Sequence, residues 1–139
     1  MIPQTNDILD IDFEIEKDPS LVHRALIEAG EKEIIGLTDG LRAVKQAIYM
    51  ILMTERYQHV IYSWDYGVEL LSLYGKPVTY ACPEIERRIR EALLMDDRIL
   101  EVYDFTFDLK SKDHQVIHTT FKVRTIYGEL EEEKEVRIR

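Results

Sequence analysis

Two carboxylates near the middle of the 139-residue chain are of the residue type that glycoside hydrolysis requires. Glu55 precedes an aromatic segment, and Asp65 lies between two aromatic residues. Hydrolysis of a glycosidic bond uses two carboxyl groups roughly 5–9.5 Å apart, with the pKa of one raised by burial. A structural interpretation is open as well: Glu55 then pairs with Arg56 or Arg42. Asp65 then caps a helix that starts near Gly67. We favour this second interpretation, because 27 carboxylates offer many accidental pairs.

The other reactive residue types do not form a catalytic or metal-binding motif. Cys82 is the single cysteine, and it stands before a predicted helix whose dipole would lower a thiol pKa. We nevertheless expect an inert, half-buried thiol. His114 and His118 fall at a turn and on the next strand, where four residues span roughly 13 Å, so we expect no metal ion between them. Nucleophile-elbow and glycine-rich phosphate motifs are absent. We therefore expect no catalytic residue and no cofactor.

The net charge of −9 is unevenly distributed. Residues 1–40 hold 3 basic and 10 acidic side chains, residues 41–100 hold 8 of each, and residues 101–139 hold 7 and 9. An acidic surface repels phosphate backbones, so we expect no nucleic-acid binding. Two interpretations of this negative charge stay open. It attracts a basic partner, or it only keeps the chain soluble. No apolar run approaches the ~18 residues of a membrane span, and we expect neither a membrane segment nor a secretory signal.

Hydrophobic spacing predicts a single domain over residues 11–139, with residues 1–10 as a flexible lead-in. Residues 11–16 alternate apolar and acidic side chains, which predicts a strand with one face in water. Residues 21–30 have helical spacing, but the segment is short enough to be part of a long loop instead. Residues 33–37 predict a second strand.

The broadest apolar stripe predicts a helix over residues 41–53, with Thr38 or Asp39 capping its free amides. Its core face would comprise Leu41, Val44, Ile48, Ile51 and Leu52, widened by Met50 and Met53. Such a stripe favours a central core helix over a helix shared with a partner. After it, residues 60–62 predict a short strand, and residues 68–74 predict a two-turn helix.

A second long helix is predicted over residues 83–95, because a proline is tolerated in a first helical turn. Its core positions would be Ile85, Ile89, Ala92 and Leu93. On the opposite face, Glu84 and Glu86 precede Arg88 and Arg90 by four residues, a spacing worth about 0.2–0.5 kcal/mol per pair.

The last third alternates apolar and polar residues, which predicts three antiparallel strands over residues 99–109, 116–126 and 136–139. In the second strand one face would comprise Ile117, Thr119, Phe121 and Val123. In the first, either Val102 or Tyr103 joins Phe105 on the core face. The fold class is therefore α+β: two long helices and a short one packed on a mostly antiparallel sheet with a C-terminal β-meander.

Three segments of the chain resemble a known family. They are LTDGLRAVKQAIYMILMTERYQHVIYSWDYGVEL from residue 37, PEIERRIREALLMDDRI from residue 83, and VYDFTF from residue 102. In type and order they resemble the XkdS-like proteins of contractile phage tails and of the defective prophage PBSX, over residues 33–130. That group is similar in turn to the baseplate wedge and sheath-initiator proteins of contractile injection systems, some of which are labelled lysozyme-like.

Two motifs carry the wider similarity. The segment Thr54-Glu55-Arg56 follows the first helix, and Trp64-Asp-Tyr-Gly67-Val-Glu-Leu70 matches an aromatic-x-x-G-x-x-L pattern. The chain departs from the family at this first motif. Tyr57 follows Arg56, and the Glu-Pro-Arg triplet of some relatives is absent.

The resemblance implies a structural protein, not an enzyme. It would be made in the bacterial cytoplasm and assembled into a virion baseplate, in six copies around the tail axis. There it would link baseplate wedge proteins to the tail sheath protein, and its C-terminal strand would pair with arms of the first sheath ring. The alternatives are a peptidoglycan hydrolase and a generic cytoplasmic adaptor domain.

Three surfaces are candidate partner-binding sites. The first is the motif region, Thr54, Glu55, Arg56, Trp64, Tyr66 and Gly67, with Trp64 in the core as the alternative. The second is a basic helix face, Arg87, Arg88 and Arg90, which otherwise is simply solvated. The third is the terminal strand, Val136, Arg137, Ile138 and Arg139, which otherwise is a solvated hairpin. We expect removal of this strand to leave a folded domain that no longer supports sheath assembly.

Overall fold

The computed structural model describes residues 21–25, 34–109 and 115–139, so the predicted lead-in and the predicted strand over 11–16 lie outside the described residues. The elements, in chain order, are β1 (Val22–Ala25), β2 (Ile34–Thr38), α1 (Gly40–Met53), a 3-10 helix η1 (Leu71–Leu73), α2 (Val78–Leu93), β3 (Ile99–Asp108), β4 (Val116–Thr125) and β5 (Gly128–Arg137). The α+β class is confirmed, and the predicted short helix is the 3-10 turn η1.

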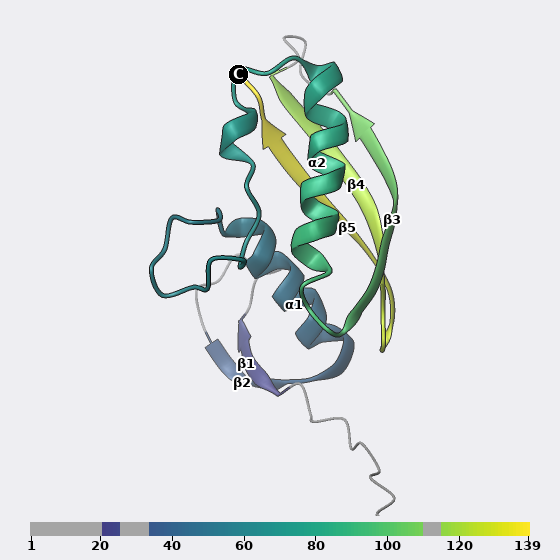
Figure 1. The fold of residues 1–139 in the computed structure, drawn as a ribbon. Coiled ribbons are helices and arrows are strands. Elements are labelled where there is room, and N and C mark those ends of the chain that lie inside the picture. The colour runs from purple at the N-terminus through teal and green to yellow at the C-terminus, as the bar shows by residue number, and fades with distance from the viewer. Residues whose placement is uncertain (1–20, 26–33, 110–114) are drawn as a thin grey trace, which may run out of the picture.

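The described strands form two antiparallel sheets, a β1–β2 hairpin and the meander β3–β4–β5. Helix α2 runs along one face of the meander. Helix α1 and the hairpin lie near the end of α2 that leads into β3 (Figure 1). The C-terminus lies beside the segment that leads into α2 (Figure 1). The molecule is thus a helical layer on a three-stranded sheet, with the second face of the sheet in water.

Helix α1 begins one residue earlier than predicted, at Gly40, and the choice of cap is resolved. The side chain of Asp39 accepts a hydrogen bond from the amide of Gly40 at 2.6 Å. The buried residues of α1 are Ala43, Val44, Ile48, Ile51 and Leu52. The prediction that Met50 and Met53 widen this face is wrong, since they are 40% and 60% exposed. At 100° per residue, Met53 lies about 180° around the helix from Val44, and Met50 lies about 120° from it, outside the buried stripe.

Helix α2 begins five residues earlier than predicted, at Val78, so that Pro83 lies inside it. The carbonyl of Pro77 accepts from the amides of Tyr80 and Ala81, which closes the first turn ahead of Pro83. The predicted core face is confirmed, because Ile85, Ile89, Ala92 and Leu93 are all buried. The two predicted ion pairs are present as well, Glu84–Arg88 at 3.0 Å and Glu86–Arg90 at 2.7 Å.

The meander has the predicted alternation but a longer third strand. On β4, the residues Ile117, Thr119, Phe121 and Val123 are fully buried. On β3, Asp104 has φ +58°, and the register with β4 shifts between Tyr103 and Thr106. This bulge returns Phe105 to the core face, so that Val102, not Tyr103, shares that face with it.

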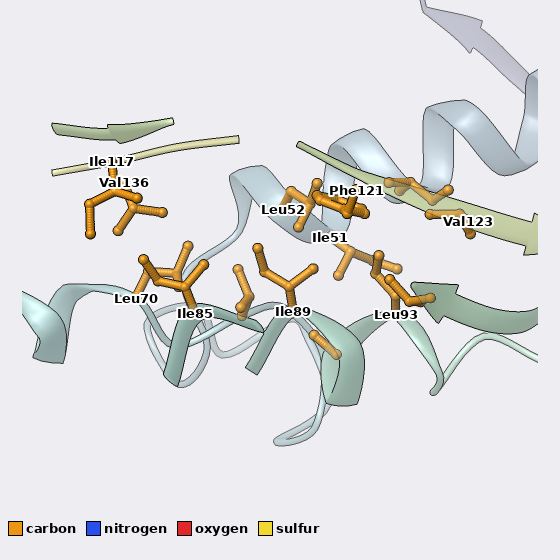
Figure 2. Packing of buried hydrophobic residues seen from close by; sticks show 14 of the residues in the cluster. Ile51, Leu52, Leu70, Ile85, Ile89, Leu93, Ile117, Phe121, Val123 and Val136 are labelled. Carbon is orange, nitrogen blue, oxygen red and sulfur yellow. The ribbon is translucent and has the colours of Figure 1, made fainter. Parts of the chain in front are cut away.

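The core lies between α2, α1 and the inner face of the meander. Ile85, Ile89 and Leu93 of α2 face side chains of α1 and of β4, with Val136 of β5 at one end (Figure 2). The Phe105 ring stacks on Phe121 with 5.2 Å between centroids. This packing holds α1 and the connection to α2 against the sheet, and so positions the segment between them.

Two local predictions are wrong. Residues 22–25 form a strand, not a helix or loop, because backbone groups of this segment pair with β2 and with Gln46 of α1. The Gln46 side chain accepts from the Ala25 amide at 2.9 Å and donates to the His23 carbonyl at 2.8 Å. Residues 60–62 form turns, not a strand, since no neighbouring strand among the described residues pairs with them.

Candidate functional site

The segment between α1 and η1 forms a loop whose base is closed by backbone hydrogen bonds. The amide of Val68 donates to the Thr54 carbonyl at 3.0 Å, and the Arg56 amide donates to the Val68 carbonyl at 3.2 Å. Gly67 has φ +91°, and an added Cβ would lie 2.6 Å from the Thr54 carbonyl oxygen. The backbones therefore approach so closely that only glycine fits at position 67.

Glu55 holds the other side of this base. Its carboxylate accepts from the amide of Leu70 at 3.0 and 3.1 Å, and from the amide of Leu71 at 3.0 Å. Glu55 therefore caps η1 with charge-assisted hydrogen bonds. The predicted pairing of Glu55 with Arg56 or Arg42 is wrong, because no ion pair within the described ranges joins them.

Arg56 and Thr54 complete the closure. The Arg56 Nε donates to the Gly67 carbonyl at 3.1 Å, and its guanidinium lies 3.5 Å from a carboxylate oxygen of Glu91 on α2. The Thr54 hydroxyl donates to the Met50 carbonyl at 2.7 Å. The Thr-Glu-Arg motif thus fastens the loop to α1, η1 and α2, which is a structural task within this chain.

A stability measurement tests the role of Glu55. We expect Glu55→Ala to lower the free energy of unfolding by about 1–3 kcal/mol, because it leaves the Leu70 and Leu71 amides without their acceptor. Glu55→Gln should cost less, since its amide oxygen still accepts. Urea denaturation of the two variants, compared with the unchanged chain, gives both numbers. Equal stability of all three proteins would contradict the capping role.

The hydrogen bonds of Glu55 and Asp65 do not favour the hydrolytic pair, because partners within the chain already occupy both carboxylates. Hydrogen bonds from the Ser63 side chain and from its own backbone hold the pKa of Asp65 below its usual value. A glycosidase general acid needs the opposite shift. The prediction that Asp65 caps a helix near Gly67 is wrong, since the next helical turn begins at Leu71.

The outer part of the loop presents apolar and aromatic side chains to solvent. Tyr57, Val60, Ile61 and Trp64 are 68%, 103%, 86% and 76% exposed. The alternative that Trp64 belongs to the core is therefore wrong. Isolated exposed apolar residues are ordinary, but four within eight positions make this surface a candidate interaction site.

Stacked rings shape this surface, which we call the loop tip and define as residues 57–66. Tyr62 stacks on Tyr66 with 4.6 Å between ring centroids, and His59 lies edge-on to Tyr62 at 6.0 Å. A pocket of about 240 Å³ opens between the tip and the motif residues Thr54 and Glu55. Of the predicted motif residues, Trp64 and Tyr66 thus reach the tip, and the others form its base.

The three helix arginines do not line the pocket at the loop tip, and each is engaged within the chain. Arg87 pairs with Glu84 and Glu91 at 3.0 Å. Arg88 donates to the Glu69 carbonyl at 2.8 Å. Arg90 donates to the Val102 carbonyl and lies over the Phe105 ring. The carboxylates of α2 therefore offset much of the predicted basic face.

Of the predicted terminal strand, Val136 and Arg137 end β5, and Ile138 and Arg139 follow it. Val136 and Ile138 are 3% and 2% exposed, whereas Arg137 and Arg139 are exposed. The Ile138 amide donates to the Gln115 carbonyl at 2.8 Å, and its carbonyl accepts from the Gly75 amide at 2.7 Å. The chain end is therefore built into the fold and is not a solvated hairpin.

The sequence interpretation did not single out the loop-tip residues Tyr57, Val60 and Ile61. They form an apolar cluster on a segment too short to make a core element of its own, which is the signal that could have found them.

The prediction that Cys82 stands before a helix is wrong. Cys82 lies within α2, where burial raises its thiol pKa. Neither finding points to catalysis.

Two classes of site are not found in the described ranges. No group of three or more His, Cys, Asp or Glu side chains there could hold a metal ion. His118 pairs with Glu135, while His114 lies outside the described residues. None of the helices in this part of the chain is long and apolar enough to cross a membrane.

Comparisons with known proteins match most of the chain. The family model of the contractile injection system sheath initiator matches residues 9–128. The phage-like element PBSX protein XkdS of Bacillus subtilis strain 168 is 42% identical over 101 residues, which are 70% of each chain.

A solved structure is similar in fold. It is a crystal structure from Geobacter sulfurreducens, described provisionally as a tail lysozyme, with a TM-score of 0.57 and 19% identity. The match covers 69% of this chain and 88% of that one. At this identity the likeness shows the fold alone.

Proposed function

Because this chain belongs to the contractile injection system sheath initiator family and so is a structural protein of contractile tails, we propose that it joins baseplate wedge proteins to the tail sheath. In this proposal six copies surround the tail axis in the virion baseplate. The open edge of β5 receives an extended arm of the first sheath ring, and the loop tip contacts a wedge protein. The observation that carries the proposal is the regular edge of β5, whose outward backbone groups bond to no other strand in the described part of the chain.

The hydrogen-bonding phase of β5 identifies which of its groups are open. Val116 opposes Arg137, and the neighbouring amide of Ile138 donates to Gln115. In an antiparallel pair, hydrogen-bonded and non-hydrogen-bonded positions alternate. Even-numbered residues of β5 therefore bond to β4, while odd-numbered residues from Glu129 to Arg137 direct their N–H and C=O away from it. These groups match what an added strand requires.

A proline at an outward position tests the sheath contact. Glu133→Pro removes an N–H that does not bond to β4 and places a ring where an added strand would lie. We expect baseplates with tubes but no sheath when this variant replaces the natural chain, as seen by electron microscopy of tails. Glu133→Thr is the matched control, because it keeps the amide and loses only one carboxylate. Backbone pairing at the edge then survives, and sheathed tails should still form. Sheathed tails from the proline variant would exclude the β5 edge.

Two aspartates at the loop tip test the wedge contact. Val60 and Ile61 are almost fully exposed, so Val60→Asp/Ile61→Asp should leave the unfolding free energy within about 0.5 kcal/mol of the unchanged value. The charges should nevertheless exclude the protein from purified tails, because they oppose burial against a partner. Met95→Asp/Leu100→Asp introduces the same charge at exposed apolar residues elsewhere and should be incorporated normally. Incorporation of both variants would count against the loop tip.

The description of the Geobacter structure as a tail lysozyme makes hydrolysis the second candidate. The lowered pKa of Asp65 and the occupied carboxylate of Glu55 speak against it. We expect purified protein to leave the turbidity of a peptidoglycan suspension unchanged. Clearing that disappears in Glu55→Gln would replace the structural proposal with an enzymatic one.

A further inference from the structure

The two edges of the meander differ in their fitness for pairing. The β3 edge is interrupted twice, because the register with β4 shifts between Ile99 and Glu101 and again near Asp104. Bulges of this kind twist an edge away from an incoming strand. Strand β5 pairs with β4 without a register shift over ten consecutive positions, from Gly128 to Arg137, so its outer edge is uninterrupted. Of the two edges of the meander, the β5 edge is therefore the one that fits a long partner strand.

The outward positions of β5 also carry a row of carboxylates. These are Glu129, Glu131, Glu133 and Glu135, all exposed and all on the solvent face. The two outer ones are paired with β4, Glu129 with Arg124 at 3.3 Å and Glu135 with His118.

The two central carboxylates differ from the outer ones. Lys122, which opposes Glu131, directs its ammonium to Asp104 on β3 at 2.6 Å, and Glu133 opposes the neutral Thr120. No ion pair within the described part of the chain reaches Glu131 or Glu133. Two carboxylates two residues apart thus stand beside open backbone groups at the middle of the edge.

We infer that the β5 edge selects an extended segment with lysine or arginine at alternate positions, placed to meet Glu131 and Glu133. The inference rests on the proposed sheath contact and specifies the chemistry of the arm. Side chains directly opposite on neighbouring strands lie about 4.5–5.5 Å apart at Cβ, so basic residues at a two-residue spacing meet both carboxylates at once. Backbone hydrogen bonds supply the adhesion, and the charges select the partner and its register.

Charge argues against two other occupants of the same edge. A second copy of β5 would bring its own glutamates against this row, and like charges directly opposite are destabilising. The segment of residues 11–16, with sequence IDFEIE, alternates apolar residues with three carboxylates and meets the same repulsion. A basic segment of another protein is the occupant that this edge accepts.

Peptide binding to the full chain tests the inference directly. The probe is a fluorescein-labelled nonapeptide that alternates threonine and lysine, compared with one that alternates threonine and glutamate. We expect binding of the lysine peptide alone, by fluorescence anisotropy, with slowed amide hydrogen exchange at the odd-numbered residues of β5. Glu131→Lys/Glu133→Lys should weaken it by at least about tenfold, because attraction becomes repulsion at both positions.

A charge-matched variant separates the edge from net charge. Asp97→Lys/Asp108→Lys makes the same change in charge at exposed positions outside β5 and should bind the lysine peptide within about twofold of the unchanged chain. Equal loss in both double variants, or slowed exchange on β3 instead, would overturn the inference. No peptide binding, combined with sheath loss in Glu133→Pro, would reject the charge rule alone. Sheathed tails from Glu133→Pro would reject the proposed function and this inference with it.

Discussion

Replacing Gly67 by alanine should lower the free energy of unfolding by about 2–5 kcal/mol. A left-handed backbone costs a residue with a Cβ about 1–2 kcal/mol, and forcing atoms into a filled site adds about 1–3 kcal/mol. Both apply to Gly67, which has φ +91° and whose Cβ would lie 2.6 Å from the Thr54 carbonyl oxygen. That oxygen accepts the Val68 amide, so it cannot move without opening the loop base.

Gly75 provides the matched control for this experiment. It has φ +83°, but an added Cβ there would have no atom within 4 Å. Gly75→Ala should therefore cost only the backbone part, about 1–2 kcal/mol. Urea denaturation of the two variants isolates the close contact as the difference between them. Equal costs would show that the loop base relaxes freely, and the account of the Thr-Glu-Arg closure would then be wrong.

Removal of residues 136–139 should unfold much of the domain at ordinary temperature. Val136 and Ile138 are buried, and each apolar side chain of this size contributes about 1.5–3 kcal/mol. The deletion also removes the hydrogen bonds of Ile138 with Gln115 and Gly75. The sum is comparable with the stability of a whole domain, about 5–15 kcal/mol.

This prediction replaces the expectation drawn from the sequence, which was that the domain without residues 136–139 stays folded. Circular dichroism during thermal unfolding provides the measurement, and removal of Arg139 alone is the control, since Arg139 is exposed. A cooperative transition at an unchanged temperature in the four-residue deletion would show that the end of β5 is dispensable for folding. Sheath contacts at this edge are therefore tested with Glu133→Pro, which spares the core.

The long periodic elements were predictable because their own sequence specifies which face is buried. In α2 the positions of Ile85, Ile89 and Leu93 follow the helical repeat, and all three are buried as expected. In β4 the two-residue repeat placed Phe121 and Val123 correctly in the core. Such patterns span several turns or pairs, so a misplaced end, as at Pro83, does not change the face.

The short elements depended on neighbours that are distant in sequence. Residues 22–25 take a strand conformation because β2 and Gln46 supply their hydrogen-bond partners. Residues 60–62 contain β-branched residues but pair with no strand in the described part of the chain, and so they form turns. Local propensity is weak over three or four residues, and tertiary contacts decide.

The sequence by itself determined the α+β class, the family resemblance and the motif residues around Glu55 and Trp64. Only the tertiary structure decided what they do: Glu55 and Arg56 close a loop, while Val60, Ile61 and Trp64 present its tip to solvent. It also decided that Glu131 and Glu133 share an open edge while Val136 lies in the core. Spacing fixes which side of an element a residue occupies, but whether that side meets water or another element depends on the arrangement of the whole chain.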